Sequence, residues 1–201
     1  CLAVAGTATC LAPTPVVGVQ NYRIGVNMTK SELAKRVKET AYLEGDFTLR
    51  SGKKSKYYLD KYLFETQPDV LKALGEEFAK HAGGDVTLIA GAELGGVALA
   101  AATAMQTSKR WIIVRNSKKD YGTSKMIEGV LKKDDVVLLV EDIATTGGQV
   151  LEAAKVITAA GAKVKKIVAV IDRKQGASEN IAAAGYKFES ILTKEDLGIT
   201  D

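Results

Sequence analysis

The chain has 201 residues, the length of one domain, and its 46% hydrophobic and 26% charged residues are typical of a folded globular protein. Its single histidine, His81, and its two cysteines, Cys1 and Cys10, are too few for a zinc site of His and Cys ligands. The 28 basic and 24 acidic residues give a net charge of +4 and are interspersed, so no basic stripe indicates a nucleic-acid partner. Small anionic ligands, with any metal held by oxygen, fit this composition better.

Residues 1–27 differ from the rest of the chain. Arg23 is their only charged residue, and both cysteines lie among them. They lack the basic start of a signal peptide and the run of about 20 apolar residues that spans a membrane. We therefore expect a leader or an expression-derived segment over 1–27, and a single domain without a membrane partner over 28–201. The absence of cysteine after residue 27 suits the reducing cytoplasm.

Helices and strands are expected to alternate along residues 28–201. Thr29 and Glu32 have the spacing of a capping box and predict a first helix. Two extended segments, 47–50 and 57–63, follow around a glycine turn, and Pro68 opens the next helix. Beyond it we expect strands over 86–90, 111–115, 136–140, 164–171 and 188–192, and helices over 96–105, 148–160 and 179–184.

Short apolar runs of Val, Ile and Leu between helices are typical of a parallel sheet that helices cover on both faces. The predicted fold class is α/β: a doubly wound, mostly parallel sheet with a small N-terminal add-on of one helix and the 47–63 segments. Ligands of such sheets bind beyond the carboxyl ends of the strands. Three of these ends, at 90–96, 115–122 and 141–148, carry unusual residues, and we expect the chemistry there.

The most specific signal is the run over residues 136–149. Glu141 and Asp142 follow an apolar strand, and the turn Thr-Thr-Gly-Gly at 145–148 leads into a helix. Backbone N–H groups, hydroxyls and the helix dipole make such a turn a cradle for phosphate, while the carboxylates suit sugar hydroxyls or a hydrated divalent cation. In the alternative interpretation, Thr146 is only a helix cap and the two acids are a solvated strand end. The run as a whole favours a sugar-phosphate site.

This run resembles the motif with which type I phosphoribosyltransferases bind 5-phosphoribosyl 1-pyrophosphate (PRPP). Residues 44–60, 114–129 and 171–174 look like segments of orotate phosphoribosyltransferase, and the resemblance extends from about Met28 to Gly198. It implies a type I phosphoribosyltransferase-like fold and transfer of ribosyl 5-phosphate from Mg-PRPP to N1 of orotate. The products would be orotidine 5′-monophosphate, an intermediate of de novo pyrimidine synthesis, and pyrophosphate. A homodimer with shared active sites is also implied, with Mg²⁺ carried by PRPP.

The resemblance further implies roles for individual residues. Glu141 and Asp142 would orient the ribose and stabilise positive charge on its ring, while Lys119 and Asp120 of a mobile loop would act in the neighbouring subunit's site. Fixed charges in these places stabilise the transition state more than the ground state. The residues implied in PRPP binding are Arg115, Lys118, Glu141, Asp142, Ile143, Ala144, Thr145, Thr146, Gly147 and Gly148, and those implied in orotate binding are Arg50, Lys53, Tyr58, Thr145 and Arg173.

The sequence departs from the family pattern in four places. Asn116 stands where a lysine is common and Ser117 where a glutamate is usual, while Ala92 replaces a common proline and Tyr121 a histidine of some members. Without the lysine the pyrophosphate site loses one cation. We therefore expect low turnover.

Several interpretations stay open on the sequence alone. Lys53 suits a solvated hairpin tip, and residues 116–125 suit an ordinary surface loop. The turn 93–96 suits either backbone contacts to pyrophosphate or a plain strand-to-helix turn. Because Tyr57 and Tyr58 alternate across a strand, we expect one in the core and one at the ligand. The alternative functions are a phosphoribosyltransferase for another base, such as a purine, and a PRPP-binding regulator without catalysis.

Overall fold

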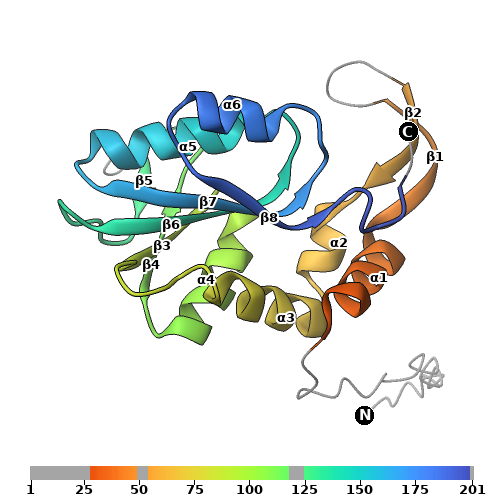
Figure 1. The fold of residues 1–201 in the computed structure, drawn as a ribbon, viewed down its shortest axis with the longest axis horizontal. Helices are drawn as coiled ribbons and strands as arrows, with labels where there is room; N and C mark the ends of the chain where they lie inside the picture. The colour runs from red at the N-terminus through yellow and green to blue at the C-terminus, as the bar shows by residue number, and fades with distance from the viewer. Residues whose placement is uncertain (1–27, 49–53, 118–124, 200–201) are drawn as a thin grey trace, which may run out of the picture.

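A six-stranded sheet forms the centre of the protein, whose computed structural model describes residues 28–48, 54–117 and 125–199 (Figure 1). The strand order is β5-β4-β3-β6-β7-β8, and all neighbours are parallel except β4 and β5. The strands are β3 (Leu88–Ala92), β4 (Arg110–Val114), β5 (Ile127–Glu128), β6 (Val136–Ala144), β7 (Lys163–Asp172) and β8 (Phe188–Thr193).

Helices cover both faces of this sheet, with α3 (Pro68–Ala79) and α4 (Gly96–Thr107) on one face and α5 (Gly148–Ala159) and α6 (Ala177–Ala183) on the other (Figure 1). Successive side chains of a strand point to opposite faces, and β6 follows this rule. Leu138 and Val140 belong to the core beneath α3 and α4, whereas Val137 and Leu139 belong to the core beneath α5 and α6. The expected doubly wound, mostly parallel sheet is confirmed.

The N-terminal add-on consists of α1 (Lys30–Ala41), the antiparallel pair β1 (Tyr42–Thr48) and β2 (Lys54–Leu59), and the short helix α2 (Lys61–Glu65). The expected capping box is present: the backbone N–H of Thr29 donates to Glu32 Oε2 at 2.8 Å, and the backbone N–H of Glu32 donates to Thr29 Oγ1 at 3.3 Å. The add-on lies at the end of the sheet where β6 and β7 finish (Figure 1).

The prediction of an extended segment over 57–63 is wrong for its second half. The strand β2 ends at Leu59, and Asp60 then caps α2 by accepting a hydrogen bond of 3.1 Å from the backbone N–H of Tyr62. A five-residue helix is too short for an apolar period to reveal it in the sequence. The consequence is that Lys61 and Glu65 lie on a helix rather than on a strand.

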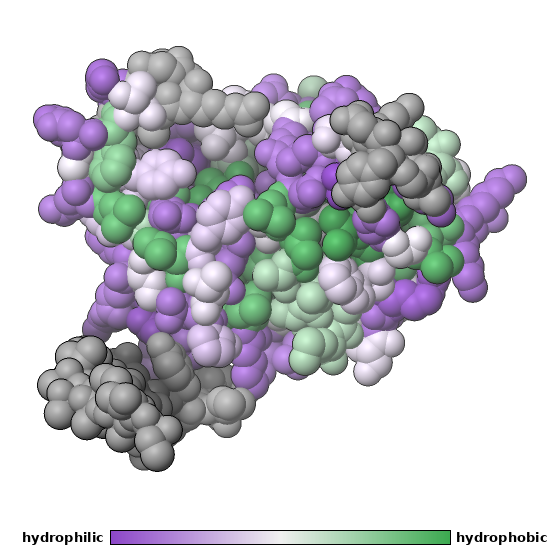
Figure 2. Space-filling view, turned by 180° about the vertical axis from the view of Figure 1, so that it is seen from behind, coloured by the Kyte–Doolittle hydropathy of each residue, from purple (hydrophilic) through white to green (hydrophobic). Residues whose placement is uncertain are grey.

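Some large apolar side chains remain exposed, among them Met105 (82%), Val130 (64%) and Leu94 (60%). Figure 2 shows that apolar surface gathers in a band on the face opposite to that of Figure 1. No helix of the described residues is long and apolar enough to cross a membrane. Residues 1–27, expected to be a leader, lie outside the described residues.

Candidate active site

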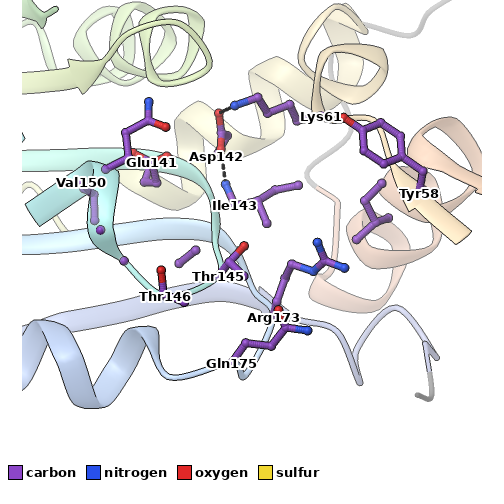
Figure 3. Close-up of a pocket in the computed structure, with 15 residues that line it drawn as sticks. Tyr58, Lys61, Glu141, Asp142, Ile143, Thr145, Thr146, Val150, Arg173 and Gln175 are labelled. Carbon is purple, nitrogen blue, oxygen red and sulfur yellow. Dashed lines mark hydrogen bonds and ion pairs between the residues drawn. The ribbon is translucent and has the colours of Figure 1, made fainter. Parts of the chain in front are cut away.

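A cavity of about 870 Å³ opens at the carboxyl ends of β6 and β7, beside the add-on (Figure 3). It lies where ligands of doubly wound sheets bind. Its lining comprises Tyr58, Leu59, Lys61, Glu141, Asp142, Ile143, Ala144, Thr145, Thr146, Gly147, Gly148, Gln149, Val150, Arg173 and Gln175. Ten of the residues that the sequence implicates are therefore brought together in one cavity.

The turn 145–148 connects β6 to the N-terminus of α5. The N-cap position is held by Gly147, with φ of 78°, and not by Thr146. A Cβ at Gly147 would also lie 3.0 Å from Ile181 Cγ1. The positive φ and the lack of room for a side chain therefore both require glycine at this position. The first residues of α5 line the cavity and no side chain caps the helix, so its positive end and first-turn N–H groups are available to a ligand there. The side chain of Asn180 donates to the carbonyl of Thr146 at 2.9 Å and steadies the turn.

The acids Glu141 and Asp142 are buried, with exposed fractions of 5% and 2%. The strand continues past them to Ala144, so the alternative of a solvated strand end is wrong. Glu141 Oε2 has no hydrogen-bond partner among the described residues. Burial, and next the charge of Asp142, raise the pKa of Glu141 well above its ordinary value. A ligand hydroxyl at Glu141 Oε2 would supply the missing hydrogen bond.

Two residues of α2 join the acids, and the sequence reasoning missed both. Lys61 Nζ lies 2.6 Å from Asp142 Oδ2 (Figure 3). Burial opposes the charged form of Lys61, but the charge and hydrogen bond of Asp142 outweigh it, and the pKa of Lys61 is raised. Glu65 is 5% exposed, and burial, together with Asp142, raises its pKa to about 8. Lys61 and Glu65 are four residues apart and would share one face of a helix, but the sequence pattern predicts a strand here, which hides this relationship.

The turn 93–96 lies directly against the acid pair. A Cβ at Gly95 would be only 1.6 Å from Asp142 Oδ2, so the carboxylate packs on the glycine backbone and no other residue fits there. Asp142 thus stands between the cavity and this turn. None of residues 93–96 is among the lining residues of the cavity, so contact of this turn with pyrophosphate stays a prediction.

Arg173 and the tyrosine pair form the other end of the cavity. Arg173 Nη2 donates to Tyr57 Oη at 3.3 Å, and the guanidinium lies 5.8 Å from the centre of the Tyr57 ring. Tyr57 packs against the core, whereas Tyr58 lines the cavity and is 42% exposed. The alternation expected for the two tyrosines is confirmed. Among the described lining residues, Arg173 is the arginine available to an anionic group here.

Arg115 lies outside this lining, in an adjoining cavity of about 490 Å³ that shares Gly148 and Gln149 with it. Its Nη1 atom is 3.7 Å from Glu93 Oε1 and 4.0 Å from Glu128 Oε1. The remaining expected site residues, Arg50, Lys53, Lys118, Lys119 and Asp120, lie outside the described residues. Across the described residues, no three or more His, Cys, Asp or Glu side chains are placed to hold a metal ion.

Comparison with known proteins defines the class. A family model described as a phosphoribosyl transferase domain matches residues 63–190. The orotate phosphoribosyltransferase of Natronomonas pharaonis is 42% identical over 171 residues, 85% of this chain and 98% of the relative. The crystal structure of Mycobacterium tuberculosis orotate phosphoribosyltransferase with Fe(III) dicitrate has a TM-score of 0.76 and 31% identity, over 85% of this chain and 99% of that one.

A second crystal structure of the Mycobacterium tuberculosis enzyme is a complex with PRPP, with a TM-score of 0.73 and 29% identity, over 85% of this chain and 99% of that one. The fold, the cradle at its carboxyl edge and the matching model define a phosphoribosyltransferase. Within that class, the chain belongs to the orotate phosphoribosyltransferase family. The family resemblance and the type I phosphoribosyltransferase-like fold expected from the sequence are confirmed, and the relatives are enzymes.

Proposed function

We propose that the cavity transfers ribosyl 5-phosphate from Mg-PRPP to N1 of orotate, forming orotidine 5′-monophosphate and pyrophosphate in de novo pyrimidine synthesis. The observation that carries this proposal is one cavity with a phosphate cradle at 145–148, two buried acids beside it, and Arg173 at its far end. A phosphate, a ribose and an anionic base, in that order, match these three groups.

The 5-phosphate is held at the N-terminus of α5. Thr145 and Thr146 offer hydroxyls and Gly147 and Gly148 offer backbone N–H groups, with the helix dipole behind them. Ile143 and Ala144, the last residues of β6, line the cavity beside this turn.

The reaction breaks the bond between ribose C1 and the pyrophosphate oxygen and forms a bond from C1 to orotate N1. The pyrophosphate leaves with the electron pair, so positive charge develops on the ribose ring. Asp142 and Glu141 lie where they stabilise this charge and accept hydrogen bonds from the ribose hydroxyls. Glu141 Oε2 gains a partner when a hydroxyl donates to it.

Arg173 binds the orotate carboxylate, because a guanidinium matches that group with two parallel hydrogen bonds. Tyr58 borders the base, and Arg50 and Lys53 of the β1–β2 connection contribute to the same site by family resemblance. A purine lacks the carboxylate and leaves the Arg173 guanidinium without an anionic partner. The geometry therefore supports an orotate enzyme over a purine enzyme.

Mg²⁺ enters as part of the substrate Mg-PRPP. The donors around the cavity are carboxylates and hydroxyls, which suit a hydrated Mg²⁺, and Glu141 Oε2 has no partner within the part of the chain that the structure describes. Bound to PRPP, the ion neutralises the pyrophosphate. Chelation of Mg²⁺ should abolish turnover.

The protein acts as a cytoplasmic homodimer with shared sites, in which Arg115, Lys118, Lys119 and Asp120 close over PRPP of the neighbouring subunit. The exposed apolar side chains and the apolar band of Figure 2 support self-association. Residues 28–201 form the enzyme, and a chain that begins at Met28 should retain activity.

The direct test is the fall in orotate absorbance on mixing the protein with PRPP and Mg²⁺. Gly147→Ala should raise the KM for PRPP about tenfold or more, because it strains the cradle and crowds Ile181. The matched control is Gly185→Ala, whose φ of 86° imposes a similar strain at a position with no atom within 4 Å of the new methyl group. Absence of turnover by the unaltered protein, or equal effects of the two variants, would contradict the proposal.

A further inference from the structure

The contact between Lys61 and Asp142 joins the N-terminal add-on to the acids of the central sheet. Asp60 caps α2 and thereby places Lys61 at the first helical position, from which its side chain extends along the cavity wall (Figure 3). The ammonium reaches Asp142 Oδ2 at 2.6 Å, and the two side chains are 27% and 3% exposed. A buried, charge-assisted contact of this length fixes the geometry of both partners.

The carboxylate of Asp142 is held from three sides. Its Oδ1 atom accepts a hydrogen bond from the backbone N–H of Ile143, and its Oδ2 atom lies against Gly95 and accepts from Lys61. The contacts with Ile143 and Gly95 come from the backbone at the carboxyl ends of the strands. Lys61 supplies the third and is the only cation paired with Asp142 among the described residues.

Lys61 also lies beside an unusual concentration of buried acidic groups. Glu65, Glu141 and Asp142 are all buried around its ammonium, and Glu65 Oε1 and Glu141 Oε2 have no hydrogen-bond partner among the described residues. A doubly phosphorylated sugar brings further negative charge to the same place. Without Lys61, the unpaired charge of Asp142 would oppose PRPP binding, and Asp142 would lose the side-chain partner that holds it against Gly95.

We propose that Lys61 is a positioning residue of the reaction: it holds the Asp142 carboxylate between the ribose and the turn 93–96 and balances the charge of that carboxylate. This proposal rests on the proposed function, since it assigns the ribose to Asp142. Lys61 acts through Asp142 and not by contact with the base. Loss of Lys61 should therefore change kcat and the KM for PRPP but leave the KM for orotate unchanged.

The test compares Lys61→Met, Lys61→Arg and the unaltered protein. Lys61→Met should weaken PRPP binding and lower kcat by about tenfold to a hundredfold, because a buried carboxylate loses a charged hydrogen-bond partner. Lys61→Arg keeps the donor and the charge and should recover most of the loss. Lys72→Met is the control, because Lys72 pairs with Glu76 on α3, away from the cavity, and both constants should stay unchanged.

A second measurement separates positioning from a structural role. In an Asp142→Asn background, Lys61→Met should have little further effect, since the partner on which it acts is already altered. Calorimetric titration with PRPP measures the change in PRPP affinity in the absence of orotate. If the protein bound PRPP but did not convert orotate, the proposed function would be overturned while the test of Lys61 remained valid. Additive losses in the double variant, or PRPP affinity unchanged in Lys61→Met, would overturn the role of Lys61. A variant that loses folding is identified by its thermal transition, and Lys61→Gln then takes its place.

Discussion

The side-chain amide of Asn116 donates a hydrogen bond of 2.7 Å to the backbone carbonyl of Glu93. The same carbonyl accepts a bond of 2.7 Å from Gln149 Nε2, which also donates to Asn116 Oδ1 at 3.2 Å. In return, the backbone N–H of Asn116 donates to Glu93 Oε2 at 3.1 Å. Asn116 stands where a lysine was expected, and it ties the end of β4 and the start of α5 to the turn 93–96.

Removal of this link should weaken PRPP binding. Asn116→Ala deletes two side-chain hydrogen bonds of the Asn116–Glu93–Gln149 network, each worth about 0.5–1.5 kcal/mol, and should raise the KM for PRPP by about tenfold. The KM for orotate should stay constant, because Arg173 is untouched. Initial rates at varied PRPP measure this change. The control Gln106→Ala removes an exposed amide from α4, and an equal effect there would refute the role of Asn116.

Arg173 should determine affinity for the base. Arg173→Ala removes the guanidinium that we assign to the orotate carboxylate and should raise the KM for orotate by about tenfold or more, with a much smaller effect on PRPP. Tyr57→Phe removes only the hydroxyl that Arg173 contacts at 3.3 Å and should have a smaller effect. Steady-state kinetics with each substrate varied in turn decide the matter. Equal increases in both KM values for Arg173→Ala would move Arg173 out of the base site.

The raised pKa of Glu65 predicts a pH-dependent stability. Burial raises this pKa from 4.5 to about 8, so the folded state binds more protons than the unfolded state between these values. The free energy of unfolding contributed by Glu65 is therefore greatest below pH 4.5 and falls as the pH rises towards 8. Glu65→Gln should raise the Tm at pH 9 and leave it nearly unchanged at pH 5. Calorimetric scans at both pH values test this, and a difference in Tm that does not vary with pH would be contrary to it.

The sheet and the phosphate cradle could be predicted from the sequence because local signals specify them. The apolar run before Glu141 determines a buried strand, and the turn 145–148 that follows has few structural uses other than binding an anion. Arg173 was reached only through family resemblance, since a single arginine after a strand carries no signal of its own.

The contacts of the acids could not be predicted, because they depend on tertiary structure. Asp142 meets Lys61 only because the end of β6 and the start of α2, distant in the sequence, lie at the same side of the cavity. The length of β6 hid the burial of Glu141, since pattern alone ended the strand at Val140. For the same reason, the hydrogen bonds of Asn116 to two other segments could not be predicted, and the low turnover expected from the missing cation stays a prediction.

Shared active sites predict complementation between inactive variants. Lys119→Ala and Glu141→Gln should each be nearly inactive, because they remove opposite halves of the charge stabilisation. In a mixed dimer one site carries both defects and the other carries neither. With random pairing, about half of the dimers are mixed, and co-expression should restore about a quarter of the unaltered sites. Activity that stays at the level of the parents, although native mass spectrometry shows mixed dimers, would place the loop in its own subunit's site.

Base selectivity is the property that the proposed function depends on: the cavity should join ribosyl 5-phosphate to orotate and to no purine. The most direct measurement incubates the protein with Mg²⁺, limiting PRPP and equal amounts of orotate, uracil, adenine and hypoxanthine, and identifies the nucleotides by mass spectrometry. Orotidine 5′-monophosphate should be the only nucleotide formed, because Arg173 requires a carboxylate on the base. A purine nucleotide as the main product, or intact PRPP with no nucleotide formed, would contradict it.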